Sequence, residues 1–134
     1  MMISTKGRYA LRVMIELAER YDVGFVSLKS VSDNQQISEK YMESIISLLV
    51  KNGLVEGVRG RGGGYKLTRP AEEYSVGSIL TITEGTLAPV ACLENGDGDC
   101  VRSCECKTQP IWQNLDKIIN DYLESVKLSD LINR

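Results

Sequence analysis

The sequence predicts a mostly α-helical protein with a small β-hairpin wing, in which a winged helix-turn-helix domain is followed by a long C-terminal helix. The first supporting observation is the order of the elements: helix, short helix, turn, helix and then a glycine-tipped hairpin. The second is the charge distribution. Residues 1–70 carry eleven Lys and Arg against seven Asp and Glu, a net charge of +4, whereas residues 71–134 carry five against eleven, a net charge of −6. A basic front half predicts a module that binds a polyanion, joined to a part with another task.

The first two helices follow from apolar spacing and turn residues. A helix from about Thr5 to Arg20, capped by Ser4 or Thr5, is predicted because four apolar residues share one face: Leu11, Met14, Ile15 and Ala18. A shorter helix near Leu28–Asn34 follows a turn at Gly24.

The clearest element is a helix over residues 39–52. Ser38 is a good N-cap, Glu39 suits the positive start of the helix, Lys51 suits its negative end, and Gly53 is a C′ stop. The buried stripe of this helix is predicted to consist of Met42, Ile45, Ile46 and Leu49.

A glycine-rich hairpin follows this helix. Two β-like runs, Leu54–Arg59 and Tyr65–Arg69, flank the stretch "GRGGG", and Pro70 ends the second run. No Gly-Lys-Ser/Thr follows the glycines, so the loop is not a phosphate-binding loop of an NTPase. Such a tip is often just a solvated turn. It is also suited to lie along phosphates or enter a narrow minor groove, where negative potential attracts arginine.

These elements predict that the protein binds double-stranded DNA, with the N-terminal end of the helix over residues 39–52 in the major groove. Glu43 could accept a hydrogen bond from a cytosine N4 amine, whereas Ser and Lys suit bases or phosphates. Tyr41 could equally pack in the core. The candidate DNA-binding residues are Ser38, Lys40, Tyr41, Glu43, Ser44, Arg59, Arg61, Gly62 and Gly63.

The acidic back half predicts a dimerisation element. After a helix near Val76–Glu84, a helix that opens with Pro110 carries one apolar stripe and Trp112, an interface or core residue, and "LSDLINR" predicts a short terminal helical turn. The stripe consists of Ile111, Leu115, Ile118, Tyr122 and Val126. Packing on the first helix of the same chain would cover it. Packing on a second copy would also cover it, and such a homodimer would read a pseudo-palindromic operator.

No apolar run approaches the ~20 residues that a membrane span needs. The N-terminal stretch is interrupted by charges and lacks a signal-peptide pattern. We therefore expect a cytoplasmic protein without a membrane partner. In that compartment thiols stay reduced, and clustered cysteines favour metal binding or redox chemistry.

The four cysteines of the chain lie in one polar, glycine-rich segment: Cys92, Cys100, Cys104 and Cys106. A segment of this composition cannot fold by burying apolar area, so metal binding would have to order it. Structural zinc, an iron–sulfur cluster and a thiol switch stay open on spacing alone. The chain has no histidine and no Cys-x2-Cys pair, so we expect that it is not an enzyme.

Three stretches carry a resemblance to a known family: "STKGRYALRVMIELA", "ISEKYMESIISLLVKNGLVEGVRGRGGGYKL" and the cysteine segment followed by "IWQNL". The chain resembles the IscR-like regulators of the Rrf2 family over essentially its whole length. That family includes cluster-sensing regulators of iron–sulfur biogenesis, nitric-oxide sensors and repressors of cysteine metabolism that lack the cysteines. The resemblance implies a dimeric winged-helix repressor or activator: a DNA-binding domain at 1–84, a cluster-binding loop at 85–109 and a dimerisation helix with a C-terminal turn at 110–134.

The same resemblance implies an iron–sulfur cluster as cofactor, 2Fe–2S in preference to 4Fe–4S. By this resemblance, the three cysteines of the family pattern correspond to Cys92, Cys100 and Cys106. Gln109 stands where the biogenesis regulators have a histidine ligand, and Arg8 stands where the nitric-oxide sensors have a carboxylate. Cys104 is the first candidate for the fourth ligand, and a three-cysteine site completed by water or by a borrowed ligand is the second. The alternative function is a zinc- or thiol-stabilised winged-helix repressor of cysteine and sulfur metabolism without such a cluster.

Overall fold

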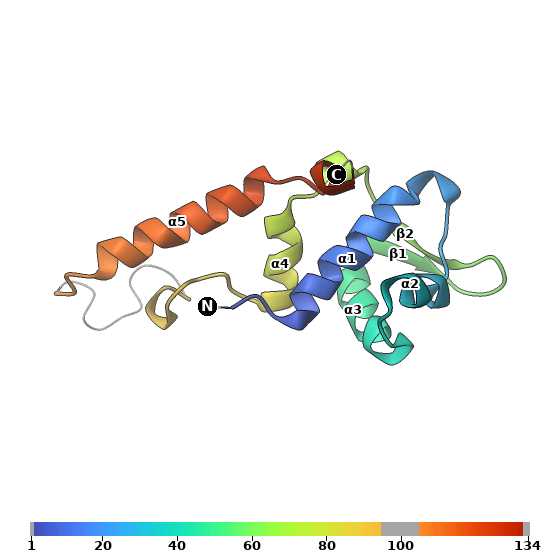
Figure 1. Ribbon diagram of the computed structural model, residues 1–134, viewed down its shortest axis with the longest axis horizontal. Coiled ribbons are helices and arrows are strands. Elements are labelled where there is room, and N and C mark those ends of the chain that lie inside the picture. The colour runs from blue at the N-terminus through green and yellow to red at the C-terminus, as the bar shows by residue number, and fades with distance from the viewer. Residues whose placement is uncertain (1, 95–104, 133–134) are drawn as a thin grey trace.

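The computed structural model describes residues 2–94 and 105–132 and confirms a mostly helical fold with a two-stranded antiparallel hairpin (Figure 1). In these ranges the α-helices are α1 (Thr5–Glu19), α2 (Leu28–Gln35), α3 (Glu39–Lys51), α4 (Val76–Glu84), α5 (Gln109–Ser125) and α6 (Leu128–Ile132). The strands are β1 (Val55–Val58) and β2 (Gly64–Leu67), and short 3-10 helices are η1 (Tyr21–Val23), η2 (Ala71–Glu73) and η3 (Ala91–Leu93).

Helix α1 is the central element of the core. The Ser4 hydroxyl caps it by accepting a hydrogen bond from the Gly7 amide at 3.0 Å. Leu11 and Ile15, two residues of the predicted stripe, are only half-buried, because α1 packs between α4 and α6 on one side and α2, α3 and β2 on the other. Its fully buried residues are Ala10, Val13, Met14 and Leu17.

Helices α2 and α3 form the predicted helix-turn-helix pair. Ser27 and Ser38 are their N-caps, and Gln36 makes the turn with a left-handed backbone, φ 57° and ψ 45°. The predicted buried stripe of α3 is confirmed, and Gly53 follows the helix with a φ of 76°.

The wing is attached to the core at two points. Val26, which precedes α2, exchanges two backbone hydrogen bonds with Tyr65 of β2, at 2.9 and 2.8 Å. At the base of the hairpin the buried hydroxyl of Tyr74 donates to the Leu54 carbonyl at 2.8 Å and accepts from the Thr68 amide at 3.1 Å. The wing therefore has a fixed position relative to α3.

Helix α5 extends away from the rest of the molecule, and the chain then returns to the core (Figure 1). Among the described elements α5 packs mainly on α4. It begins one residue before Pro110 and ends at Ser125, so Val126 of the predicted stripe lies just outside it. The Leu128 amide donates to the Tyr74 carbonyl at 2.9 Å, and the Leu128 side chain is fully buried in the main core. Helix α6 is thus part of the core that α1 organises.

Across the described ranges, none of the helices has the length and hydropathy needed to cross a bilayer.

Candidate nucleic-acid interface

The N-terminal half of α3 presents a polar, exposed face. Lys40, Glu43 and Ser44 are exposed, while the stripe on the opposite face is buried in the core. Ser38 is exposed as well, and its hydroxyl oxygen accepts a hydrogen bond from the Tyr41 amide at 3.2 Å. Since a hydroxyl can also donate, Ser38 can cap the helix and still contact an external acceptor.

The Tyr41 side chain is partly packed against the core and partly exposed, the two alternatives that the sequence left open. Its ring meets the Tyr9 ring edge-on, with 5.7 Å between centroids and an interplanar angle of 85°. The side chain is half-buried and packs against the main core. Its remaining surface borders a shallow hollow with Lys40 and Ser44. Tyr41 therefore links α3 to α1 at the exposed edge of the helix.

The wing tip carries two exposed arginines on a glycine backbone. Arg59 and Arg61 are exposed, and neither makes an ion pair or hydrogen bond with another residue in the described ranges. Gly60 and Gly62 have φ values of 95° and 78°, a region that favours glycine, and the Gly63 amide donates to the Gly60 carbonyl at 3.0 Å. The tight turn thus leaves both guanidinium groups available to a ligand.

A groove of about 520 Å³ separates the C-terminal half of α3 from the wing. Ser47, Val50 and Lys51 line it from α3, and Arg59 and Tyr65 line it from the wing. Ser47 and Lys51 line this groove but are not among the candidate residues from the sequence, where Lys51 matches the charge preference of a helix end. Of the predicted contact residues Arg59 lines this groove, whereas the predicted contacts on α3 lie nearer the start of that helix.

Two of the four cysteines lie in the described ranges, and neither is in a disulfide bond. Cys92 is half-buried in η3, and the half-buried Cys106 lies just before α5, with its Sγ 3.3 Å from Thr108 Oγ1. Cys100 and Cys104 lie outside the described residues. Gln109 is the buried first residue of α5, and Arg8 is exposed on α1 and donates to Thr5 Oγ1 at 3.1 Å.

A helix-turn-helix pair with an exposed α3 face, next to a glycine-tipped cationic hairpin, defines a winged-helix DNA-binding protein. The chain belongs to the Rrf2 family, described as "Iron-dependent Transcriptional regulator", whose model matches residues 3–134. It is accordingly a transcription regulator that binds DNA, and not an enzyme.

Similar proteins of this family include regulators named IscR and CymR, and one CymR is described as a global cysteine regulator. The HTH-type transcriptional regulator IscR of Serratia proteamaculans is 37% identical over 133 residues, which cover 99% of this chain and 80% of that relative. The structure of CymR, the global cysteine regulator of B. subtilis, matches with a TM-score of 0.82 and 35% identity, covering 99% of this chain and 97% of that one. The structure of T. potens IscR matches with a TM-score of 0.79 and 35% identity, covering 99% and 87%.

Proposed function

We propose that this regulator is a cytoplasmic homodimer that binds a pseudo-palindromic operator through α3 and the wing, and that it senses iron–sulfur status through the cysteines of residues 85–109. The observation that carries the DNA contact is the exposed polar face of α3 together with the exposed cationic wing tip, which a groove separates from the C-terminal half of α3. In this proposal residues 1–84 bind DNA, residues 85–109 hold the cluster and residues 110–134 carry the dimer contact.

Within this surface the α3 residues have distinct roles. Glu43 accepts from a cytosine N4 amine in the major groove, because a carboxylate can pair with that base edge. Lys40 and Ser44 contact phosphates or bases beside it, and Ser38 and Tyr41 contact the backbone. At the wing, Arg59 and Arg61 contact phosphates or the minor groove, and the small residues Gly62 and Gly63 allow close approach.

The apolar stripe of α5 supports the homodimer. Ile111, Ile118 and Tyr122 are 56%, 64% and 65% exposed, although they share one helix face. Packing of the stripe on α1 of the same chain, the alternative left open by the sequence, would have buried these side chains. Pairing of two α5 helices across a two-fold axis buries the same patch on both subunits.

The residues present fit an iron–sulfur cluster in their chemistry, because thiolates are its usual protein ligands. Cys92 and Cys106 flank the polar segment at positions anchored by the fold: Leu93 beside Cys92 is buried, and α5 begins three residues after Cys106. η3 and the start of α5 lie at the same end of the molecule (Figure 1). When bound, a 2Fe–2S cluster supplies a group that oxidants, nitric oxide or iron limitation can destroy. We assign Cys92, Cys100 and Cys106 as ligands and Cys104 as the fourth.

The chain connects the cysteine segment to the DNA-binding surface through α1. Glu84, at the end of α4, accepts hydrogen bonds from the Ser4 amide at 2.9 Å and from the Ser4 hydroxyl at 2.8 Å. Ser4 caps α1, and Tyr9 of α1 contacts Tyr41 of α3. A change at residues 85–94 therefore has a short path of contacts to the recognition helix.

The similarity to CymR favours a second candidate function, a zinc- or thiol-stabilised repressor of cysteine metabolism without a cluster. Purification without oxygen, followed by iron, sulfide and zinc quantitation, separates the two. We expect iron with acid-labile sulfide and visible absorbance, both lost in Cys92→Ala, Cys100→Ala and Cys106→Ala. Loss in Cys104→Ala and retention in Gln109→Ala would assign the fourth ligand. Zinc alone, or a cluster retained in all three first variants, would refute the sensing role.

Selection of duplexes from a random library tests the operator proposal separately. We expect the wild-type protein to select two related half-sites, and Glu43→Ala to relax preference at one position of each half-site by about 1–3 kcal/mol. An unchanged preference in Glu43→Ala would remove its assigned role. The same selection with iron-loaded and iron-free protein tests whether the cysteines control the choice of DNA.

A further inference from the structure

A second hollow lies beside the N-terminal turn of α3, whereas the groove to the wing lies beside its C-terminal half. Its volume is about 450 Å³, and α1, the helix-turn-helix turn and α3 all contribute to its lining: Thr5, Tyr9, Gln36, Ile37, Ser38 and Tyr41. Gln36 is the non-glycine residue with positive φ among the described residues, and such backbone strain is concentrated at functional sites.

Two arginines of α1 lie on the same helix face as Thr5 and Tyr9, the α1 residues that line this hollow. Arg8 and Arg12 are one helical turn apart, on the face of α1 that also carries Thr5 and Tyr9, and both are exposed. Arg8 Nη2 donates to Thr5 Oγ1 at 3.1 Å. The Arg12 guanidinium lies 5.2 Å from the centre of the Tyr9 ring.

The helix-turn-helix pair also holds Arg12 in place. Its Nε donates to Gln35 Oε1 at 3.0 Å, and its Nη2 donates to the Gln35 carbonyl oxygen. A guanidinium with a fixed orientation loses less conformational entropy when it binds a phosphate, and its planar donors match phosphate oxygens.

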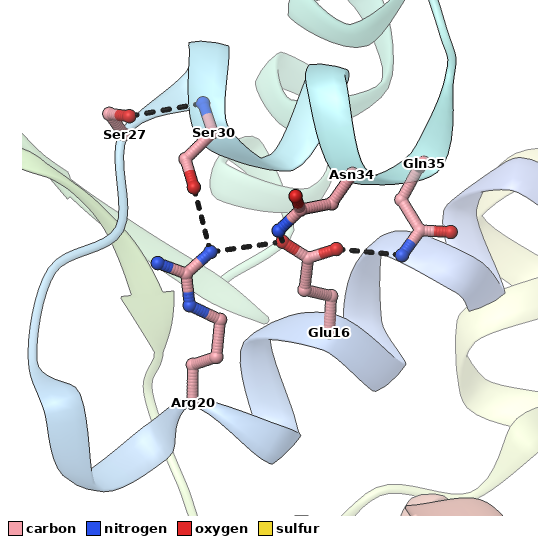
Figure 2. Close-up of polar contacts among 6 residues, drawn as sticks. All are labelled: Glu16, Arg20, Ser27, Ser30, Asn34 and Gln35. Atoms are coloured by element: carbon pink, nitrogen blue, oxygen red, sulfur yellow. Dashed lines mark hydrogen bonds and ion pairs between the residues drawn. The ribbon is translucent and has the colours of Figure 1, made fainter.

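The carboxylate nearest to Arg12 along α1, that of Glu16, forms its ion pair with Arg20 and not with Arg12. Glu16, one turn further along α1, accepts hydrogen bonds from Arg20 at 3.1 Å and from Gln35 Nε2 at 2.7 Å, with Asn34 as a third donor (Figure 2). Arg20 therefore supplies the positive partner of Glu16, and the Gln35 amide bridges Glu16 and Arg12. In the described ranges neither Arg8 nor Arg12 makes an ion pair.

The hollow and the two arginines lie beside the helix that binds DNA in the proposed function. The major groove is about 12 Å wide, and a helix with its side chains is about 10–12 Å across, so a helix in the groove has a phosphate backbone on each side. The groove beside the wing can take one backbone. Arg8 and Arg12, next to the hollow at the N-terminal turn of α3, would then lie opposite the second phosphate backbone.

The geometry points to Arg8 and Arg12 as a phosphate-binding site on α1, which holds the second DNA backbone beside the N-terminal turn of α3. The inference rests on the proposed mode of DNA binding and adds residues that sequence analysis did not assign to DNA. Arg8 stands where the nitric-oxide sensors have a carboxylate ligand, which an arginine cannot replace. The inference gives this residue a function in binding phosphate.

The test measures affinity for a mixed-sequence duplex of roughly 30 base pairs, long enough for two half-sites, as a function of salt concentration. Each lost phosphate contact reduces the slope of log K against log salt by about 0.9. Because both subunits of the proposed homodimer contact the duplex, each substitution removes two phosphate contacts. We expect the slope to fall by about 1.8 in Arg8→Gln and in Arg12→Gln, and by about 3.6 in the double variant. Arg12→Lys, which keeps the charge, should keep the slope, and Lys117→Gln on α5 is the control for net charge.

The outcomes separate the inference from the proposed function. If the wild-type protein binds no duplex, the proposed function fails. If the wild-type binds and the double variant has the same slope, the inference alone is overturned, as it is if Lys117→Gln has the same effect as Arg8→Gln. If circular dichroism shows that Arg12→Gln is unfolded, Arg8→Gln decides the question.

Discussion

Glu16 is a carboxylate on the apolar side of α1, with only 8% of its side chain exposed. A buried charge destabilises the folded state by several kcal/mol unless it is paired and hydrogen-bonded. Glu16 meets that condition through Arg20 of its own helix and Asn34 and Gln35 of α2 (Figure 2). This side chain therefore determines how the helix-turn-helix pair sits on α1.

Replacement of Glu16 by Gln should destabilise the protein by about 1–3 kcal/mol, because the amide cannot accept from three donors and leaves buried groups unpaired. Chemical denaturation measures the loss, and hydrogen exchange should show it first in the α2 amides. Lys29→Gln breaks the exposed pair with Asp33 on α2 and should cost at most about 0.5 kcal/mol. Equal effects of the two substitutions would contradict the role given to Glu16.

Ser4→Ala should lower stability by more than Ser27→Ala does. Both substitutions remove a helix cap, which typically contributes about 1 kcal/mol. Ser4 also donates its hydroxyl to Glu84 at 2.8 Å, so its loss removes a second contact between α1 and α4. Thermal unfolding of the two variants side by side is the measurement, and a larger effect of Ser27→Ala would be inconsistent with this linkage.

At the scale of elements, the wing depends on close backbone contact with the segment before α2. A Cβ on Gly64, whose φ is 148°, would lie 2.4 Å from the Val26 carbonyl oxygen. This glycine is therefore required for the two backbone hydrogen bonds between Val26 and Tyr65. The hairpin strands alone would leave the wing free to change its angle to α3.

Gly64→Ala should weaken DNA binding in a protein that still folds, because the alanine displaces the wing from Val26. Gly24→Ala, outside the wing, is the matched control: its φ is 97°, but no atom lies within 4 Å of the added Cβ. The control should cost about 1 kcal/mol of backbone strain. Urea unfolding and duplex affinity distinguish them, and equal affinities would show that the Val26 contact does not position the wing.

At the scale of the whole molecule, α5 leaves the core and α6 returns to it. The Val76 amide donates to the Val126 carbonyl at 2.8 Å, and Leu128 fills a fully buried position in the main core. Both contacts lie just after α5, so the chain is anchored to α4 and to the main core at the point where α5 ends. A dimer made through α5 would consequently be connected rigidly to the DNA-binding surface of each subunit.

Ile118→Glu should convert the proposed homodimer to monomers, because it places a charge in the centre of the exposed α5 stripe. Asn120→Glu adds the same charge on the opposite face of α5 and should leave the dimer intact. Sedimentation velocity at several concentrations measures both. A wild-type monomer, or a dimer that tolerates Ile118→Glu, would remove α5 as the interface.

The elements were predictable from the sequence because their signals are local. The caps Ser4 and Ser38, the stripe of α3 and the stop at Gly53 depend on neighbours within a few residues. The exposed residues Arg59 and Arg61 were predictable for the same reason. Leu128 was not: "LSDLINR" indicates a short helix, but nothing in that stretch indicates which core it enters.

The sequence by itself thus determined the order of helices, the hairpin with its cationic tip and the amphipathic face of α5, since periodicity and capping act over one or two turns. The tertiary structure alone decided that Glu16 is buried against α2, that Val26 holds the wing and that Arg12 is held by Gln35 at the end of α2. Each of these contacts joins residues 18 or more positions apart in the chain. Such pairs carry no local pattern, because their stabilisation appears when packing of the core brings the two segments together.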